Sequence, residues 1–323
     1  MTNKNKLVLE NITHIYGAGT PFEQTALRDV SLSIEEGKIT GIIGHTGSGK
    51  STMMQLLNGL TKPTRGRVLL DGYDINTKPE DVLEEWRELP AYASLSLRAA
   101  KKAIKAEIER RRRELCFRVG LVMQYPEYQL FEETVFRDIA FGPTNMGLSK
   151  EEINLRVWEA ARLCGVEDEW LPKSPFELSG GQKRRVAVAG VMAMRPEVLV
   201  LDEPAAGLDP LGRSKIFELI RAYREQTGAT VLIVSHSMED MAQYCDNVVV
   251  LSDARVILQG EREEVFANTE LLQSVGLDIP QITRLVGILR KKGMEIPENI
   301  YTVDSAFEIL REYYAKASKG NQK

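Results

Sequence analysis

The sequence Gly44-His-Thr-Gly-Ser-Gly-Lys-Ser-Thr52 constrains the fold of this chain more than any other stretch. It follows the pattern G-x-x-x-x-G-K-S, whose glycines let successive backbone N–H groups turn inward around an anion. Residues 39–43 before it are apolar like a buried strand, and residues 51–57 after it are predicted to form a helix whose N-terminus faces the same anion. The order of strand, loop and helix predicts an α/β fold of the P-loop type and a nucleoside triphosphate ligand.

The whole loop is predicted to contact the nucleotide. Lys50 is expected to reach the β- and γ-phosphates, and the Ser51 hydroxyl is expected to ligate Mg²⁺. The alternative is a chance glycine-rich turn, which the flanking strand and helix make improbable. The predicted nucleotide ligands here are Gly44, His45, Thr46, Gly47, Ser48, Gly49, Lys50, Ser51 and Thr52.

Length and composition set limits on the class of protein. A chain of 323 residues has room for one large domain and a small one. No apolar run approaches the roughly 18 to 20 residues that a membrane span needs, and the polar N-terminus predicts no signal peptide. Cys116, Cys164 and Cys245 are scattered without a C-x-x-C pair, so we expect reduced thiols in the cytosol rather than a metal cage. The net charge of −4 offers no general attraction to nucleic acid.

Four near-continuous apolar runs end in polar residues that could share one site. The run before the P-loop is joined by residues 119–123, 198–201 and 230–234, and continuous runs are typical of parallel strands buried on both faces. Open α/β sheets bind ligands at the carboxyl ends of their strands. We therefore expect one site to collect Lys50, Ser51, Gln124, Asp202, Glu203 and His236.

The chemistry of phosphoryl transfer assigns a role to each of these strand-end residues. Asp202 is predicted to hold Mg²⁺, and Glu203 is predicted to orient and deprotonate the attacking water. Gln124 offers an amide oxygen to the metal and an N–H to the water. His236 is expected to donate to the γ-phosphate. For each residue alone, a capped strand end is the alternative interpretation.

Ser179-Gly-Gly-Gln182 is a second predicted anion-binding element. Ser179 and Gln182 fit a capping box before a helix predicted over residues 183–194. Gly180 and Gly181 leave the helix N-terminus bare, so its N–H groups are accessible to an anion. Because the P-loop already surrounds its own nucleotide, we hypothesise that this element serves a γ-phosphate in another subunit. A simple capped helix is the alternative.

Two further segments have open interpretations at the level of residues. Tyr16 ends a strand-like segment, where its ring could stack on a base or pack with its hydroxyl in water. Residues 76–115 are highly charged, and their second half has Leu97, Ala100, Ile104 and Ile108 at helical spacing. We predict a solvated helix with a narrow apolar stripe. The alternative is that its basic face binds anionic lipid headgroups or a partner.

Taken together and in order, these motifs resemble the ATP-binding-cassette (ABC) ATPases. The resemblance covers roughly residues 5–265. Further stretches at 20–27, 124–135, 174–182 and 235–244 resemble the A component of energy-coupling factor transporters, which import vitamins and trace nutrients, and most closely the second of its two A-type subunits. The charged stretch 76–115 is a departure, since family members have a short connection there.

The resemblance implies a fold with a mostly parallel sheet, an antiparallel β subdomain and an α-helical subdomain. It implies two such subunits that sandwich ATP and Mg²⁺, with Tyr16 stacked on adenine and Asp209 linking the two sites. A second ABC ATPase, a relative rather than a copy, would be one partner. The others would be a transmembrane T component, docked at residues 126–134, and a substrate-binding membrane S component. Such a subunit would be peripheral, at the cytoplasmic face of the cell membrane.

Residues 1–262 are predicted to form the ABC domain and residues 263–323 a small helical domain, with a disordered tail from Ala315. Amphipathic helices are expected over 281–292 and 305–314, the second with a capping box of Ser305 and Glu308. In the resembled family such a domain helps hold two ATPases together.

Two other functions fit parts of the sequence. A soluble ABC ATPase acting on DNA or ribosomes is favoured only by the basic run at 110–113, and neither the long coiled coil of DNA-repair members nor a second cassette is present in this chain. A non-hydrolysing regulatory subunit finds no degenerate position to support it, because Glu203, His236 and the signature are intact.

Overall fold

A six-stranded sheet forms the centre of the computed structural model, which describes residues 5–297 and 299–320, with side chains through residue 315. Its strand order is β10-β9-β3-β8-β7-β6, and all neighbours are parallel except β10 and β9. The four predicted parallel strands are confirmed, and β9 is a fifth that the sequence analysis did not predict. The bounds are β3 Ile39–Gly44, β6 Val119–Val122, β7 Val198–Asp202, β8 Thr230–Val234, β9 Asn247–Ser252 and β10 Arg255–Glu261.

A second, antiparallel sheet packs beside the first, with the order β2-β1-β4-β5. In β2 the alternation of Val30, Leu32 and Ile34 with two serines places the apolar side chains in the core and the serines outside. Such an alternation is typical of an antiparallel strand with one face in the core and one in water. The bounds are β1 Asn5–Tyr16, β2 Gln24–Glu35, β4 Arg65–Leu70 and β5 Tyr73–Asp74.

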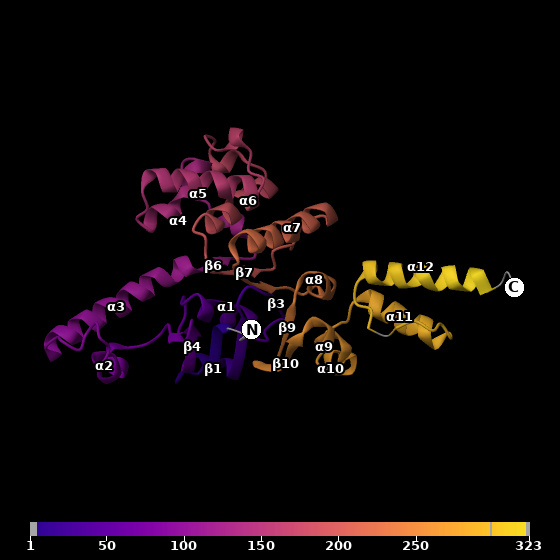
Figure 1. Cartoon of the computed structure of the whole chain (residues 1–323), viewed down its shortest axis with the longest axis horizontal. Coiled ribbons are helices and arrows are strands. Elements are labelled where there is room, and N and C mark those ends of the chain that lie inside the picture. Colours follow the sequence, from indigo (N-terminus) through magenta and orange to yellow (C-terminus); the bar gives the residue numbers. More distant parts are fainter. Residues whose placement is uncertain (1–4, 298, 321–323) are drawn as a thin grey trace.

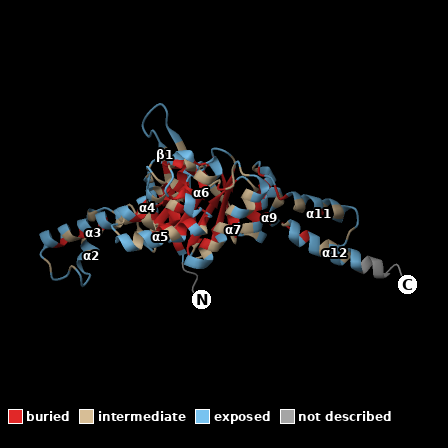
Figure 2. Ribbon diagram, turned by 90° about the horizontal axis from the view of Figure 1, so that it is seen from above, coloured by how far each residue is buried: buried red, intermediate tan, exposed pale blue. Residues whose placement is uncertain are grey.

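Two large apolar clusters cover the two faces of the parallel sheet. One cluster joins Ile42 and Val200 to Met53 of α1 (Lys50–Leu57) and to the antiparallel sheet. The other joins the sheet to helices that include α7 (Pro210–Thr227) and α8 (Met238–Tyr244). Figure 2 shows this buried centre and the exposed helices that extend from it. A strand buried on both faces explains the near-continuous apolar runs.

A lobe of helices rises over one end of the sheet (Figure 1). It consists of η1 (Pro126–Gln129), α4 (Val135–Asn145), α5 (Lys150–Leu163), η2 (Asp168–Trp170), η3 (Pro175–Glu177) and α6 (Gly180–Met192). The helix predicted over 183–194 begins earlier, at Gly180, because Ser179 caps it.

The charged stretch 76–115 forms a helical arm that projects from the body (Figure 1). The arm consists of α2 (Pro79–Arg87) and α3 (Leu97–Arg118). Ala100, Ile104 and Ile108 are buried, as the apolar stripe predicted, whereas Leu97 is 54% exposed. Leu97 is the first residue of α3, where no neighbouring turn covers it.

The C-terminal helices divide between two apolar clusters. Val265 and Phe266 of α9 (Arg262–Ala267) and Leu272 of α10 (Thr269–Ser274) join the large core. Val286 of α11 (Gln281–Lys291) and Ala306 of α12 (Val303–Gly320) belong to a separate small cluster. The division of the chain at residue 262 stays a prediction.

The cap of α12 differs from the prediction. The Ser305 N–H donates to the Thr302 hydroxyl (3.2 Å), so Thr302 rather than Ser305 caps the helix. The disordered tail expected from Ala315 stays a prediction, and α12 is described as far as Gly320. Residues 321–323 of that tail lie outside the described residues.

Candidate active site

The P-loop has the geometry of an anion cradle between β3 and α1. Gly49 has a φ of 104°, a backbone angle that residues with a side chain rarely adopt. A Cβ there would lie 2.4 Å from the Ala26 carbonyl oxygen. A Cβ on Gly44 would lie 2.4 Å from the Leu251 carbonyl oxygen. The loop therefore requires glycine at both positions, and its backbone turns into the N-terminus of α1.

Lys50 is the buried cation of this cradle. Its Nζ donates to the carbonyl oxygens of Gly44 (2.7 Å) and His45 (3.0 Å), so the side chain folds back over the loop. Burial lowers the pKa of Lys50, an effect opposed by the charges of Glu203 and Asp202. The same two carboxylates thus lie within electrostatic reach of the ammonium group.

Parallel pairing brings the predicted strand ends to one edge of the sheet. Val122 in β6 faces Leu201 in β7, and Asp202 faces Val234 in β8. Gln124, Asp202 and His236 therefore follow neighbouring strands at similar heights. Gln124 is exposed beyond the end of β6.

Glu203 occupies an unusual backbone and side-chain environment. Its φ of 47° is rare for a non-glycine residue, and its N–H donates to the Val234 carbonyl (2.9 Å). Its Oε2 accepts from the Ser235 hydroxyl (3.3 Å), and its buried Oε1 has no hydrogen-bond partner among the described residues. Burial is the largest effect on the carboxyl and raises the pKa of Glu203, which makes the carboxylate a stronger base.

His236 lies against this carboxylate, with its Nε2 3.5 Å from Glu203 Oε1. The ring is about half exposed, and partial burial together with the charge of Lys50 lowers the pKa of His236. Burial likewise raises the pKa of Asp202, and Lys50 opposes that shift. The strand ends thus bring the Glu203 carboxylate, a histidine and a second carboxylate together near one lysine.

Tyr16 lies next to the P-loop helix. Its hydroxyl is 3.1 Å from the Thr52 hydroxyl, and its ring packs edge-on to His14 with centroids 4.6 Å apart. The residue is 41% exposed, so it is accessible beside the phosphate loop.

The signature segment 179–182 forms the predicted capping box at the start of α6. The Ser179 N–H donates to Gln182 Oε1 (2.8 Å), and the Gln182 N–H donates to Ser179 Oγ (3.4 Å). Gly180 and Gly181 are exposed, and a Cβ on either would meet nothing within 4 Å. Figure 1 shows α6 in the helical lobe and α1 in the body, so the structure does not bring this segment to the chain's own P-loop.

Comparison with known proteins decides the family. A family profile described as ABC transporter matches residues 27–206. Proteins named "Energy-coupling factor transporter ATP-binding protein EcfA2" from Caldanaerobacter subterraneus subsp. tengcongensis and Clostridium acetobutylicum are 46% and 48% identical, each over 94% of this chain and 96% of the relative. The chain belongs to the ATP-binding proteins of energy-coupling factor transporters. As a member of this family of ABC proteins, it is an ATPase.

Solved structures agree with this family and with the fold. The structure of cbiO1 from Clostridium perfringens, described as part of the ABC transporter complex cbiONQ, is 37% identical with a TM-score of 0.65, over 88% of this chain and 99% of that one. A dimeric post-hydrolysis structure of the ATP-binding cassette MJ0796 with ADP and Pi is 28% identical with a TM-score of 0.61, over 79% and 98%. Among the described residues, no helix combines the length and apolarity needed to cross a membrane.

Residues at the start of α1 and at two strand ends fit the Mg²⁺ that accompanies ATP. Ser51, Gln124 and Asp202 offer a hydroxyl, an amide and a carboxylate, which are the oxygen ligands of a hard cation. No group of three or more His, Cys, Asp or Glu side chains is placed to hold a metal in the part of the chain that the structure describes. Such a sparse set suits Mg²⁺, which usually binds through one or two protein ligands, phosphates and water.

Arg184 is a residue of this energy-coupling factor ATPase that the sequence analysis missed. It lies in α6 two residues after the signature and is 8% exposed. Its guanidinium donates to the carbonyl oxygens of Glu203 (3.2 Å), Pro204 (2.6 Å) and Ala206 (2.7 Å). The signature helix is thereby bonded directly to the loop that carries the predicted base.

Replacing Arg184 by alanine is expected to destabilise the ATPase by about 2 to 4 kcal/mol, because several buried carbonyls lose a charged donor and a cavity remains. Urea unfolding measures the change. The matched control is Arg162→Ala in α5, where the arginine is exposed and forms no ion pair with described residues; that change should stay within about 0.5 kcal/mol. Equal effects of the two substitutions would contradict the role given to Arg184.

Tyr16 offers a test of the predicted base stacking. Tyr16→Ala should weaken ATP binding by roughly 5- to 150-fold, since stacking on a base contributes about 1 to 3 kcal/mol. Tyr16→Phe keeps the ring and loses only the bond to Thr52, so its affinity should stay near that of the unchanged protein. Fluorescence titration with ATP measures both. A loss of affinity in the phenylalanine variant as large as that in the alanine variant would show that the ring does not stack.

Proposed function

We propose that this chain is the peripheral motor of an importer of vitamins or other micronutrients, acting at the cytoplasmic face of the cell membrane. It would pair with a second ABC ATPase, a relative rather than a copy, and drive a transmembrane T component and a substrate-binding S component. The bare signature segment carries this proposal. Its exposed glycines present a helix N-terminus that the chain's own P-loop does not use.

The chain's own side chains divide the work of hydrolysis in this proposal. Lys50 binds the terminal phosphates, and Glu203 accepts the proton of the attacking water through its buried Oε1. His236, adjacent to that oxygen, donates to the γ-phosphate, and Gln124 orients the water. Bound Mg²⁺ would neutralise charge on the phosphates, held by Ser51 and Asp202 with Gln124. The partner subunit would complete the site with its own signature, and the signature of this chain would complete the partner's site.

Arg184 links this chemistry to movement of the helical lobe. Its bonds to the carbonyls of residues 203, 204 and 206 tie α6 to the catalytic loop. A displacement of α6 on ATP binding at the signature would therefore be transmitted to the backbone of Glu203. Closure of the dimer on ATP and reopening after hydrolysis would move the lobe relative to the body.

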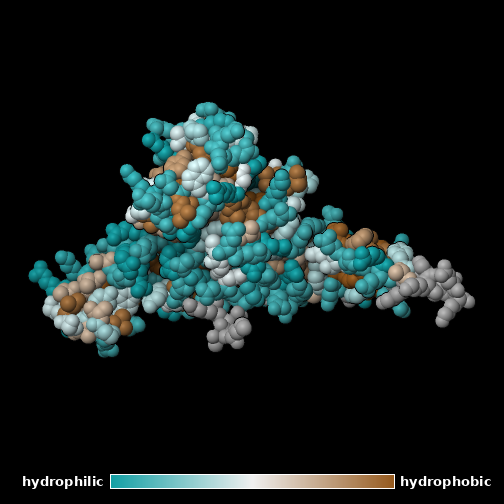
Figure 3. Space-filling model, turned by 45° about the horizontal axis from the view of Figure 1, so that its top comes forward, coloured by the Kyte–Doolittle hydropathy of each residue, from teal (hydrophilic) through white to brown (hydrophobic). Residues whose placement is uncertain are grey.

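An aromatic surface beside Gln124 is the proposed seat of the membrane subunit. Tyr125, Tyr128, Phe131 and Phe141 are between 44% and 84% exposed, and the Phe131 and Phe141 rings pack edge-on at 4.9 Å. Figure 3 shows apolar side chains where the helical lobe meets the body. Exposed aromatic side chains gathered in this way are typical of protein interfaces.

The proposed function is tested by gentle purification of the chain from its native membranes, with mass spectrometry of the proteins that accompany it. We expect a second ABC ATPase and polytopic membrane proteins, the smallest of which identifies the nutrient. Recovery only from the soluble fraction, alone or with ribosomes or DNA, would leave an ATPase and discard the transport assignment.

A variant sharpens this test. Tyr128→Ser combined with Phe131→Ser should release the membrane proteins and retain the second ATPase, because only the aromatic surface changes. The control is Phe22→Ser, which removes an aromatic ring that is 87% exposed in the loop between β1 and β2. Full retention of the membrane proteins by the double variant would place their seat elsewhere.

A further inference from the structure

The arginines and lysines of α3 fall into two groups that differ in their partners. Three arginines are paired inside the arm or against the body. Arg110 binds Glu107 and Glu114, and Arg118 binds Asp71 and Glu197. Arg111 binds Glu107 and lies over the rings of Tyr73 (4.2 Å) and Trp86 (5.2 Å).

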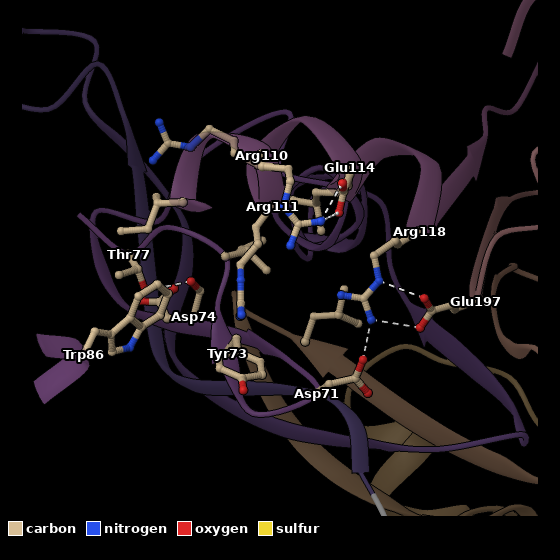
Figure 4. Close-up of a pocket in the computed structure, with 15 residues that line it drawn as sticks. Asp71, Tyr73, Asp74, Thr77, Trp86, Arg110, Arg111, Glu114, Arg118 and Glu197 are labelled. Carbon is tan, nitrogen blue, oxygen red and sulfur yellow. Dashed lines mark hydrogen bonds and ion pairs between the residues drawn. The ribbon is translucent and has the colours of Figure 1, made fainter. Parts of the chain in front are cut away.

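Figure 4 shows these paired arginines around a cavity of about 470 Å³ between the arm and β5. Arg118 reaches the base of β7 through Glu197, and Arg111 contacts the β5 side through Tyr73. Ala100, Ile104 and Ile108 are buried along the same helix. The arm is thus fixed to the body by its own contacts, and its direction does not depend on a partner.

The second group forms a cationic stripe on the outer face of α3. Its members are all exposed and follow helical spacing over roughly 22 Å of helix. Glu109 is the only acidic residue between them on that face, 3.9 Å from Lys105. The other five cations form no ion pair or side-chain hydrogen bond with any described residue. The cationic stripe consists of Arg98, Lys101, Lys102, Lys105, Arg112 and Arg113.

Repulsion between the cations of the stripe destabilises α3 in the isolated chain. Arg98 with Lys102, and Lys101 with Lys105, are like charges four residues apart, an arrangement that destabilises a helix. The stripe also opposes the net charge of −4 of the whole chain. A surface of negative charge would remove the repulsion, and neither the core nor the nucleotide site needs the stripe.

We propose that the cationic stripe of α3 binds the anionic phospholipid headgroups of the membrane. A cluster of four to eight lysines and arginines on an amphipathic helix is typical of segments that bind acidic lipids. The stripe carries no aromatic residue for stacking on bases, which is the usual companion of cations in single-stranded nucleic-acid sites. A straight row of flexible cations on a rigid arm matches a planar surface of mobile negative charge.

Sedimentation with lipid vesicles tests this proposal on the purified full chain. At about 0.1 M salt we expect at least roughly tenfold stronger binding to phosphatidylcholine vesicles containing about one-third phosphatidylglycerol than to phosphatidylcholine alone. Binding should disappear at about 1 M salt, where the Debye length is about 3 Å. The assay needs neither a membrane subunit nor ATP hydrolysis, so its failure leaves the proposed function standing.

A triple variant assigns the binding to the stripe. Lys101→Gln, Lys102→Gln and Lys105→Gln together should lower binding to the anionic vesicles by about tenfold or more. The matched control replaces Lys150, Arg162 and Lys173 of the helical lobe by glutamine, which changes the net charge equally and removes no ion pair of the described residues. ATP binding should be unchanged in both variants, which shows that they fold.

Three results would overturn the proposal. Equal binding of the unchanged protein to both kinds of vesicle would show that the membrane charge is not recognised. An equal loss in the control variant would show that net charge, rather than the stripe, decides. Loss of a membrane subunit from the purified complex of the triple variant, without any change in vesicle binding, would assign the stripe to an acidic protein surface.

Discussion

Replacing Glu203 by glutamine is expected to lower ATP turnover by about 10²- to 10⁴-fold and to leave ATP binding intact. Glutamine has nearly the same shape but cannot accept the proton of the attacking water. The buried Oε1 has no other hydrogen-bond partner among the described residues, and burial raises the pKa of this carboxyl, as a base requires. Release of phosphate measures turnover, and titration with ATP measures binding. We also expect the variant to accumulate as an ATP-bound dimer, which gel filtration detects.

The matched control is Glu225→Gln, on the exposed side of α7, where the carboxylate forms no ion pair with described residues. Its turnover should equal that of the unchanged protein. Turnover at the unchanged rate in the Glu203 variant would remove this residue from the role of base. The assay requires the partner subunit at saturating concentration, because each site is expected to need two chains.

Lys50→Ala should weaken ATP binding by roughly 10- to 150-fold, since a hydrogen bond to a charged group contributes about 1.5 to 3 kcal/mol. The ammonium group donates to the carbonyls of Gly44 and His45, so it is held over the loop where phosphates would lie. Fluorescence titration or calorimetry measures the affinity. This result separates binding from chemistry, because the Glu203 variant should show the opposite pattern.

Lys150→Ala is the control for Lys50→Ala, since Lys150 is exposed at the start of α5 and pairs with no described residue. Its ATP affinity should not change. Unchanged affinity in the Lys50 variant would contradict the assignment of Lys50 to the phosphates. Urea unfolding of the Lys50 variant distinguishes loss of a ligand from loss of the fold.

Arg184 links the helical lobe to the loop at residues 203–206, in addition to the apolar cluster that joins the lobe to the sheet. A stability loss in Arg184→Ala without a change in ATP affinity would place its effect in the loop rather than at the phosphates. ATP turnover of the same variant tests whether the contact between α6 and the loop at Glu203 is needed for hydrolysis. The acceptors of the Arg184 bonds are backbone carbonyls, so these bonds can be removed only by replacing Arg184 itself, not by changing the side chains of the loop.

The strand ends were predictable from the sequence because a buried parallel strand leaves a local pattern. An apolar run followed by Gln124, Asp202 or His236 indicates where a strand ends. Parallel pairing then places these strand ends at the same edge of the sheet. The P-loop and the capping box of Ser179 were predictable for the same reason. Each depends on residues close together in the chain, whose spacing the backbone geometry dictates.

Tertiary structure alone decided the contacts between residues far apart in the chain. The bonds from Arg184 to the loop at 203–206, the hydroxyl of Tyr16 against Thr52, and the pairing of Arg118 with Glu197 have no local pattern, because each depends on how separate elements pack. The sequence also left the basic stretch of α3 undivided. Only the packed arm shows which cations its own carboxylates neutralise and which remain exposed, because neutralisation depends on three-dimensional proximity rather than on composition.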